Sequence, residues 1–537
     1  MSVIDLEHKR FHRIACLTIV LVGLIVYSNT IHSSFHFDDS LAIVNNPLIR
    51  DLRNIPQFFQ KDAYGSASRG VATTSFAISY YLSGSSVAGY HWANISIHLL
   101  NGILVYFLAV IILNQYFTEA GGRDTAKVHA LALFAALLFT TSPIQTHTVN
   151  YIVQRSGELA TTFYLLSFIF FTKAVSQNSV SVPLYAWSVV FFLGGIWCKE
   201  IAYTAFIMMF LYYLCFVSRG WRGWPRCLKL MSPYIVLAVV SMHLVVPLHN
   251  APPLGVQLPI GEDITATVEH PWQYPLTQAH VIIEYIKLLA LPLPGRLNVD
   301  YDVTPVDTIW EPYTAACAII IIGLLCVALT FLNKTRLLAF STLWFLVTLI
   351  PTSSIFPLGE FMTCYRLYLP GLGFYLLLVA GVHKVFCYLG ARRGIEQKQL
   401  WQTELVVFIS IVLFYSVCAY EHNKVWKTDI TLWEDVVKKS PNKLRPYYNL
   451  GFACQAEGLV NRAMEEYSRC EELYANTPNM RSKIESEICS LACNNMGGVY
   501  FKAKQYNKAI TAFKKAREIN YYNVHAYSNL GMAYILT

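Results

Sequence analysis

The segment Ile14 to Ser40 reads IACLTIVLVGLIVYSNTIHSSFHFDDS, an apolar run of helix length that ends in Phe35-His36-Phe37-Asp38-Asp39-Ser40. The apolar part is long enough to form a membrane helix, and the polar part opens a long loop. Two adjacent carboxylates at the point where a helix leaves lipid are costly to desolvate, so such residues are usually functional. We therefore predict that Asp38 and Asp39 are catalytic and that the rest of the chain is arranged around this loop.

The composition places most of the 537-residue chain in lipid. Hydrophobic residues make up 55% of it and charged residues only 14%, whereas a soluble protein carries about a quarter charged residues. The formal net charge of +8 comes from Lys and Arg in short loops between apolar segments, so it indicates topology and not a nucleic-acid partner. The 13 cysteines show no CxxC spacing, which argues against a structural zinc site or a disulfide framework, and we predict no metal ion.

Eleven segments are apolar enough to be membrane helices, at about 20 residues each with some slightly shorter. They lie near 14–30, 91–113, 128–144, 158–175, 183–198, 201–217, 232–248, 313–332, 337–352, 366–388 and 403–420. No small-residue cleavage site follows the first, so we expect a retained signal anchor. The segment 277–292 is interrupted by charged residues and closed by prolines, and we predict that it is interfacial or re-entrant.

The distribution of basic residues supports this count. With a cytoplasmic N-terminus, the inner segments hold 14 Lys and Arg in 66 residues and the outer segments hold 8 in 152. This is the positive-inside pattern, and it places everything after Tyr420 on the non-cytoplasmic side. We therefore predict an all-α polytopic membrane bundle over residues 1–421.

From about Val425 the composition becomes that of a soluble protein, and a repeat appears. Asn449-Leu450-Gly451, Asn495-Met496-Gly497 and Asn529-Leu530-Gly531 recur, with a step of 34 residues between the last two. This is the tetratricopeptide period, in which each triplet lies on the first helix of a pair. The first step is 46 residues, so extra residues lengthen the first hairpin or its connection. We predict a repeat domain over 425–537 whose last helix is covered by another chain or by further sequence of a longer protein.

The polar residues of the bundle gather at the outer ends of the predicted helices. A lipid-phosphate sugar keeps its lipid tail in the membrane and its anionic phosphate at the interface, so an enzyme that uses it must supply cations there. Arg is the natural bidentate partner of phosphate and Lys is a point charge. Asp38 or Asp39 can take the proton of an acceptor hydroxyl. The candidates for the donor phosphate, followed by three supporting carboxylates, are His147, Arg155, Lys199 and Arg366, then Glu158, Glu200 and Glu360.

These candidates also have structural interpretations. The paired carboxylates of the first loop could simply cap the helix that follows. Arg155 and Glu158, three residues apart at the start of a helix, could form a local ion pair. Lys199 and Glu200 could be a short turn between two helices, with the Lys side chain extending to the surface.

The motifs resemble a known family. In chain order they are Phe35-His36-Phe37-Asp38-Asp39, Gly89-Tyr90-His91-Trp92-Ala93-Asn94, Pro143-Ile144-Gln145-Thr146-His147 with Gln154-Arg155, Cys198-Lys199-Glu200, and Tyr365-Arg366-Leu367-Tyr368-Leu369-Pro370. Followed by repeats, they look like the TMTC proteins, the transmembrane and tetratricopeptide-repeat proteins, and their bacterial relatives. The order of the motifs and the pairing of the two domains carry the resemblance, which covers nearly the whole chain.

The resemblance implies a GT-C glycosyltransferase fold, in which an acidic residue of the first loop is the base and a lipid-monophosphate sugar is the donor. In the animal members the donor is dolichyl-phosphate mannose, the site faces the endoplasmic reticulum lumen, and the product is O-mannosylated protein. The repeat array here is shorter than theirs. The stretch from Leu276 to Asp302 looks closer to bacterial relatives, in which the donor would be a polyprenyl-phosphate sugar.

These features predict an inverting glycosyltransferase that moves a sugar, mannose in the animal pattern, to a protein Ser or Thr hydroxyl on the extracytoplasmic side. We expect contact with membrane lipids, no cofactor besides the lipid-linked donor, and repeats that dock the protein acceptor. The compartment is either the bacterial inner membrane, with a periplasmic site, or the endoplasmic reticulum membrane, with a lumenal one.

Two other functions stay open. A membrane-anchored repeat scaffold without catalysis needs only a short anchor and not eleven spans. A transporter or flippase of lipid-linked sugars favours polar residues at mid-membrane, whereas the polar residues here are predicted at the outer ends of the helices.

Overall fold

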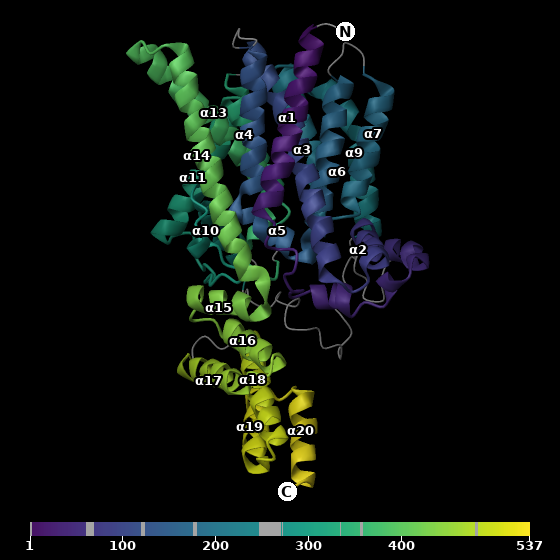
Figure 1. Ribbon diagram of the computed structural model, residues 1–537, viewed down its shortest axis with the longest axis vertical. Helices are drawn as coiled ribbons and strands as arrows, with labels where there is room; N and C mark the ends of the chain where they lie inside the picture. Colours follow the sequence, from purple (N-terminus) through teal and green to yellow (C-terminus); the bar gives the residue numbers. More distant parts are fainter. Residues whose placement is uncertain are drawn as a thin grey trace.

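The computed structural model describes residues 3–60, 69–119, 124–175, 180–245, 270, 272–332, 334–354, 358–477 and 482–537. Within these residues the regular structure is helical and contains no strand. Helices α1 to α14 form a bundle, and α15 to α20 form a smaller array beyond one end of it (Figure 1). The predicted all-α fold is therefore confirmed.

In the described residues, the membrane part contains fourteen α-helices, with short 3₁₀ and π turns between some of them. They are α1 Val3–Val26, α2 Gly70–Ser83, α3 Val87–Glu119, α4 Thr125–Thr141, α5 Thr146–Asn150, α6 Arg155–Val175, α7 Val182–Ile196, α8 Ala205–Tyr212, α9 Trp224–Val245, α10 Gln273–Ala290, α11 Pro312–Thr330, α12 Arg336–Leu349, α13 Gly371–Arg393 and α14 Gln397–Asn423.

Seven helical segments in the described residues are long and apolar enough to cross a membrane, which makes this a polytopic membrane protein. They are Val87–Phe117, Ile152–Val175, Glu200–Val217, Trp224–Met242, Pro312–Thr330, Gly371–Arg393 and Gln397–Lys427. An eighth is added if α4 and the turn that leads into α5, which meet at a bend of 43°, form one span.

Every one of the eleven predicted spans overlaps a helix, but three of these helices differ from an ordinary crossing. α7 and α12 are apolar but only 15 and 14 residues long, shorter than the roughly 20 residues of a straight span. α1 has 24 residues and includes Lys9, Arg10 and Arg13. By length and composition the structure supports seven or eight crossings, so a count of eleven stays a prediction for α1, α7 and α12.

The segment predicted to be interfacial or re-entrant forms α10, which is not among the seven spans. Its polar side chains hold the loop that precedes α13. Tyr274 donates to the carbonyl of Thr352, Gln278 to that of Phe361 and Tyr285 to that of Thr363. α10 therefore fixes the loop that carries two of the predicted site residues, Glu360 and Arg366.

The core of the bundle is apolar and closely packed. Trp344 of α12 lies fully buried among aromatic rings of α6, and its indole N–H donates to the carbonyl of Leu369. α12 and α13 approach backbone to backbone, because a Cβ on Gly373 would lie 2.4 Å from the carbonyl oxygen of Ser341. Small residues at such crossings are typical of helices that pack within membranes.

The array after the bundle has the predicted register of helical pairs. Its helices are α15 Asp429–Lys439, α16 Leu444–Ala456, α17 Val460–Asn476, α18 Lys483–Lys502, α19 Tyr506–Ile519 and α20 Val524–Ile535. Gly451 of α16 meets the Tyr467 ring of α17, and Gly497 of α18 meets the Phe513 ring of α19. The predicted extra residues of the first repeat lengthen α17 and α18 to 17 and 20 residues, against 13 and 14 for α16 and α19.

Helix α14 runs almost directly into this array. A single 3₁₀ turn, Lys424–Lys427, separates it from α15. Buried apolar residues of α15 and α16 share one cluster with Phe37 of the first loop and with Val299, so the repeats pack against the end of the bundle (Figure 1). The boundary predicted near 421–425 falls at this turn and stays a prediction.

Candidate active site

The first loop leaves α1 at the end of the bundle that faces the repeats (Figure 1). Phe37 has a φ of +48°, in the left-handed region that residues other than glycine rarely adopt. Its ring contacts Tyr151 and Trp433, with centroids 5.4 and 5.3 Å away. Backbone strain of this kind persists where neighbours hold it in place. Here it lies immediately before Asp38 and Asp39, which occupy different environments.

Asp39 is the structural member of the pair. Its side chain is fully buried, and its two oxygens accept hydrogen bonds from the backbone N–H groups of His36, at 3.0 Å, and Val153, at 2.7 Å. Burial raises the pKa of Asp39 to about 7, although both N–H groups and His36 oppose the rise. Asp39 therefore ties the first loop to the segment between α5 and α6, with both carboxylate oxygens buried and hydrogen-bonded.

Asp38 is partly exposed and has a different partner. The hydroxyl of Tyr151 donates to Asp38 Oδ2 at 2.6 Å, and the same hydroxyl accepts from the backbone N–H of Asp38 at 3.2 Å. The second carboxylate oxygen has no recorded partner in the described part of the chain. Because a general base needs a held but accessible carboxylate, Asp38 suits this role and Asp39 does not.

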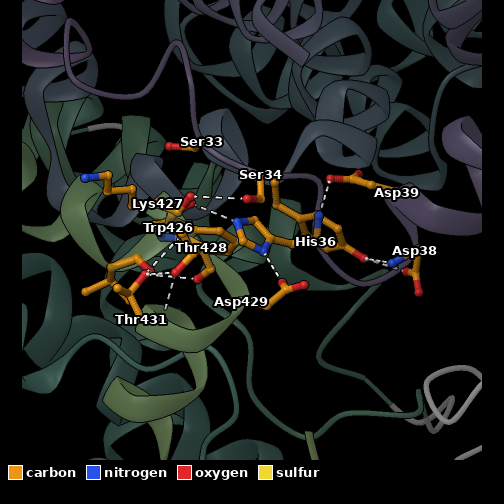
Figure 2. Close-up of polar contacts among 12 residues, drawn as sticks. Ser33, Ser34, His36, Asp38, Asp39, Trp426, Lys427, Thr428, Asp429 and Thr431 are labelled. Carbon is orange, nitrogen blue, oxygen red and sulfur yellow. Dashed lines mark hydrogen bonds and ion pairs between the residues drawn. The ribbon is translucent and has the colours of Figure 1, made fainter. Parts of the chain in front are cut away.

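His36 joins the first loop to the start of the repeat array. Its Nδ1 lies 2.6 Å from Asp429 Oδ1 and its Nε2 lies 2.8 Å from the carbonyl of Trp426. Figure 2 shows the His36 ring directed toward Trp426 and Asp429, with Asp38 and Asp39 on its other side. His36 and Phe37 thus contact the repeats, whereas Asp38 contacts Tyr151.

Lys199 lies between α7 and the turn Glu200–Thr204, near the same site. Its Nζ donates to Gln154 Oε1 at 2.7 Å and lies 5.0 Å from the centre of the Tyr365 ring. The Tyr365 ring in turn contacts Tyr151, at 6.5 Å between centroids. Burial, and then the nearby Arg69, lower the pKa of Lys199 to about 7. Asp38 and Lys199 thus stand at the two ends of a short row formed by Tyr151 and Tyr365.

Arg366 is buried next to Tyr365 and is held by main-chain carbonyls. Its guanidinium donates to the carbonyls of Glu360, at 2.6 Å, and Phe361, at 3.1 Å. Its positive charge is close enough to Lys199 to help lower the pKa of that amine. Two cations therefore lie near Tyr365, as binding an anionic phosphate requires.

Arg155 occupies a different position from the one predicted. It is buried, and its guanidinium donates to Asn94, at 2.7 Å, to Ser79, at 2.8 Å, and to the carbonyls of Ser75 and Tyr90. These bonds fasten α2, α3 and α6 together. With its donors used in this way, Arg155 acts as a structural link behind Lys199 and does not face Asp38.

The three predicted supporting carboxylates lie in different environments. Glu158 is fully buried inside the bundle, and neither of its carboxylate oxygens has a hydrogen-bond partner in the described residues. Glu200 is exposed and pairs with Arg69 at 3.4 Å. Only Glu360 is placed at the candidate site, where its carboxylate binds Arg445 at 2.5 Å.

His147 is buried, and its ring contacts Trp426 with centroids 5.4 Å apart. Its Nε2 lies 3.0 Å from Nε2 of His422, and the two rings stack. His422 belongs to α14, so this pair joins α5 to α14. The contacts of His147 favour a role in holding these helices together rather than in binding a phosphate.

Two residues of the candidate site were not singled out in the sequence. Tyr151 lies in the bend between α5 and α6, where a tyrosine looks like one more aromatic residue of a membrane segment. Arg445 lies on α16, where the repeat period accounts for the pattern around it. Each is identified only by a partner far along the chain, since Tyr151 is 113 residues from Asp38 and Arg445 is 85 residues from Glu360.

Metal-binding side chains do not converge at this site. Across the described ranges, no group of three or more His, Cys, Asp or Glu side chains is arranged to hold a metal ion. The absence of a metal therefore stays a prediction drawn from the sequence.

Comparison with known proteins adds two findings. A family model described as a tetratricopeptide repeat matches residues 490–523, from α18 to the end of the turn after α19. Similar curated proteins are named protein O-mannosyl-transferases. They include F38B6.6 of Caenorhabditis elegans, 23% identical over 84% of this chain and 61% of its own length, and Tmtc3 of Drosophila melanogaster, 22% identical over 94% and 58%.

The human relative TMTC3 is 23% identical over 83% of this chain and 50% of its own length. The chain thus spans about half to three fifths of the length of these relatives. The matched region includes the membrane bundle as well as the repeats, and the resemblance of this chain to the TMTC family is confirmed.

Proposed function

We propose that this protein is a membrane glycosyltransferase that moves one hexose, mannose by analogy with the names of its relatives, from a lipid-phosphate carrier to a Ser or Thr hydroxyl of a protein. The observation that carries the proposal is the placement of Asp38, held by Tyr151, opposite the cations Lys199 and Arg366. A base on one side and an anion site on the other are the two parts that an inverting transfer from a phosphate donor needs.

In the proposed reaction, the Asp38 carboxylate takes the proton of the acceptor hydroxyl. The hydroxyl oxygen forms a new bond to the anomeric carbon while the bond from that carbon to the phosphate oxygen breaks. The phosphate leaves with the electron pair, and the configuration at the anomeric carbon inverts. Because the leaving group is already a stable anion, no general acid is required.

Lys199 and Arg366 would bind the phosphate and stabilise the charge that develops on it. Fixed positive groups in a partly dehydrated site stabilise such charge more than water does. Lys199 rests on Tyr365 and Gln154, and Arg366 on backbone carbonyls, so both cations are held before the donor arrives. The carrier is a dolichyl or polyprenyl phosphate, whose tail remains in the bilayer beside the bundle.

The repeats would dock the acceptor protein beside Asp38, since α15 and α16 pack directly against the first loop. We place this face on the extracytoplasmic side, lumenal in the endoplasmic reticulum or periplasmic in a bacterium. Two features support this side, the positive-inside distribution of Lys and Arg and the position of the repeats at the end of the bundle opposite the start of α1 (Figure 1).

The test is transfer of labelled mannose from dolichyl-phosphate or polyprenyl-phosphate mannose to protein in membranes that contain the full chain. Four forms are compared at matched expression: wild type, Asp38→Asn, Asp39→Asn and the control Asp302→Asn, which changes an exposed carboxylate of another loop. We expect wild type and Asp302→Asn to transfer alike and Asp38→Asn to lose about 100-fold or more.

Label should be released from protein by β-elimination, as an O-linked sugar requires. Transfer by Asp38→Asn at the wild-type rate would overturn the role of Asp38. No transfer by the wild type from either donor would overturn the proposed function and favour a scaffold or a transporter.

A further inference from the structure

The first two helices of the repeat array form one wall of the candidate active site. Trp433 of α15 contacts Phe37, and Leu432 of α15 lies in a buried cluster with Tyr151. Ser440, after α15, bonds to Asn298 and to the carbonyl of Asp300, each at 2.8 Å. Because Tyr151 is the partner of Asp38, α15 and α16 lie directly behind the proposed base.

One charged residue of α16 is buried where this wall meets the bundle. Arg445 has a side chain only 13% exposed, and its Nη1 donates to Glu360 Oε1 at 2.5 Å. Its Nε lies 3.9 Å from Asp300 Oδ2, and both of these buried atoms are left without a hydrogen bond in the described residues. Asp300 is paired instead with Lys443. A buried charge that uses only part of its bonding capacity calls for an explanation beyond packing.

The contacts of Arg445 lead to the proposed phosphate site. The carboxylate of Glu360 binds Arg445, and the backbone carbonyl of the same residue accepts from Arg366 at 2.6 Å. Glu360 therefore links the guanidinium of Arg445 to Arg366.

We propose that Arg445, supplied by the repeat region, is a positioning residue of the active site, holding Glu360 and through it Arg366 in place. This inference rests on the proposed function. The transferase site is then incomplete without α16, and the repeats do more than recruit an acceptor.

Arg445 is not needed to attach α16 to the bundle. Lys439 donates to the carbonyls of Pro294, at 2.8 Å, and Leu297, at 2.7 Å. Lys443 donates to Asp300 and to the carbonyl of Tyr301. With the contacts of Ser440 these bonds anchor the array, so loss of Arg445 should leave its seating intact.

The experiment uses the full chain with Arg445→Met, Arg445→Lys, Glu360→Gln and the control Arg462→Met. Arg462 forms a comparable pair with Glu434, at 2.5 Å, in the repeat region. The kcat for sugar transfer and the KM for the donor are measured for each form, together with hydrogen exchange of the amides of residues 360–366.

We expect Arg445→Met to lower kcat by about 10- to 100-fold, because a misplaced binding group commonly costs that much. KM for the donor should rise as well, since Arg366 is proposed to bind the donor phosphate. Arg445→Lys should restore only part of kcat, because Lys lacks the planar fork.

Glu360→Gln should lower kcat and raise KM for the donor in the same way, since it removes the carboxylate that Arg445 holds. Both Arg445→Met and Glu360→Gln should speed exchange at 360–366, and Arg462→Met should behave as wild type in every measurement.

Two results would overturn the inference while leaving the proposed function intact. One is a wild type that transfers sugar and an Arg445→Met form that follows Arg462→Met. The other is an Arg445→Met form with lower kcat, an unchanged KM for the donor, and faster exchange throughout α15 and α16, which would make Arg445 a purely structural residue. If the wild type transfers no sugar, the proposed function fails, and the role of Arg445 fails with it.

Discussion

The hydroxyl of Tyr151 lies 2.6 Å from Asp38 Oδ2 and 3.2 Å from the backbone nitrogen of the same residue. One phenol thus donates to the carboxylate and accepts from the main chain, which fixes both the loop and the side chain of the proposed base. Burial, followed by the charges of Asp38 and Asp39, raises the pKa of Tyr151, so it remains a donor at any pH of interest.

Replacing Tyr151 by Phe should remove this orientation and keep the ring contacts with Phe37 and Trp426. A hydrogen bond to a charged group contributes about 1.5–3 kcal/mol, so we expect kcat to fall by about 10- to 100-fold with little change in KM for the donor. Steady-state transfer kinetics measure this. Tyr447→Phe is the control, because its hydroxyl bonds only to the carbonyl of Pro441 within the repeats. Equal kcat for the two variants would contradict the orienting role.

Asp39 should make stability depend on pH. Its pKa is about 7 in the folded protein against a usual 3.8. A carboxyl whose pKa is raised by folding stabilises the fold most below the unfolded pKa and loses that contribution as pH rises through the folded one. The wild type should therefore lose thermal stability between about pH 4 and pH 7 relative to Asp39→Asn, in which this residue cannot titrate.

The Asn variant should also be less stable overall by about 1–3 kcal/mol, because its amide nitrogen cannot accept from His36 or Val153. Thermal unfolding of the detergent-solubilised chain at a series of pH values measures both effects. Asp302→Asn, at an exposed position, should follow the wild type. An Asp39→Asn form whose stability has the same pH slope as the wild type would contradict the burial of Asp39.

Lys199 should make binding of the donor weaker as pH rises. Its pKa is lowered to about 7, by burial first, so the amine loses its charge just above neutrality. Since the proposed phosphate site needs that charge, KM for the lipid-phosphate donor should rise several-fold between pH 7 and 8.5. Arg in place of Lys199 stays protonated throughout and should flatten this dependence.

The measurement is KM for the donor across this range in wild type, Lys199→Arg and Lys287→Arg. Lys287 of α10 is an exposed control that pairs with Glu284 at 2.5 Å. If KM of the wild type is independent of pH, or rises equally in Lys199→Arg, then Lys199 does not bind the phosphate.

The sequence could reveal the parts of this protein whose signals are local. Apolar runs predict helices, and the spacing of Asn449-Leu450-Gly451 and its two later counterparts predicts the helical pairs, because each signal depends on residues within a few turns. α7 and α12 show the limit of this reasoning. A hydropathy pattern marks an apolar helix, but whether 14 or 15 residues cross the bilayer depends on tilt and on neighbouring helices.

The same local reasoning could predict only part of the candidate site. Asp38 and Asp39 are equivalent in sequence, and they differ only because Phe37 turns the chain so that Asp39 meets two backbone N–H groups. Arg155 looks like a phosphate ligand until its contacts with α2 and α3 are known. Such roles depend on contacts between distant segments, which no local pattern records.

The repeat array offers the sharpest test of packing. A Cβ on Gly497 would lie 2.5 Å from the ring of Phe513, which is 1% exposed and cannot move aside freely, whereas a Cβ on Gly531 would meet nothing within 4 Å. Gly497→Ala should therefore destabilise α18 and α19 by about 1–3 kcal/mol through overpacking. Gly531→Ala should stabilise α20 by up to ~1 kcal/mol, because Ala favours the helix over Gly.

Hydrogen exchange of the helix amides in the full chain measures both changes. Equal protection of α18 in the two variants would show that the Asn-x-Gly glycines are not sites of close helix contact, and would contradict the packing of Gly497 against Phe513.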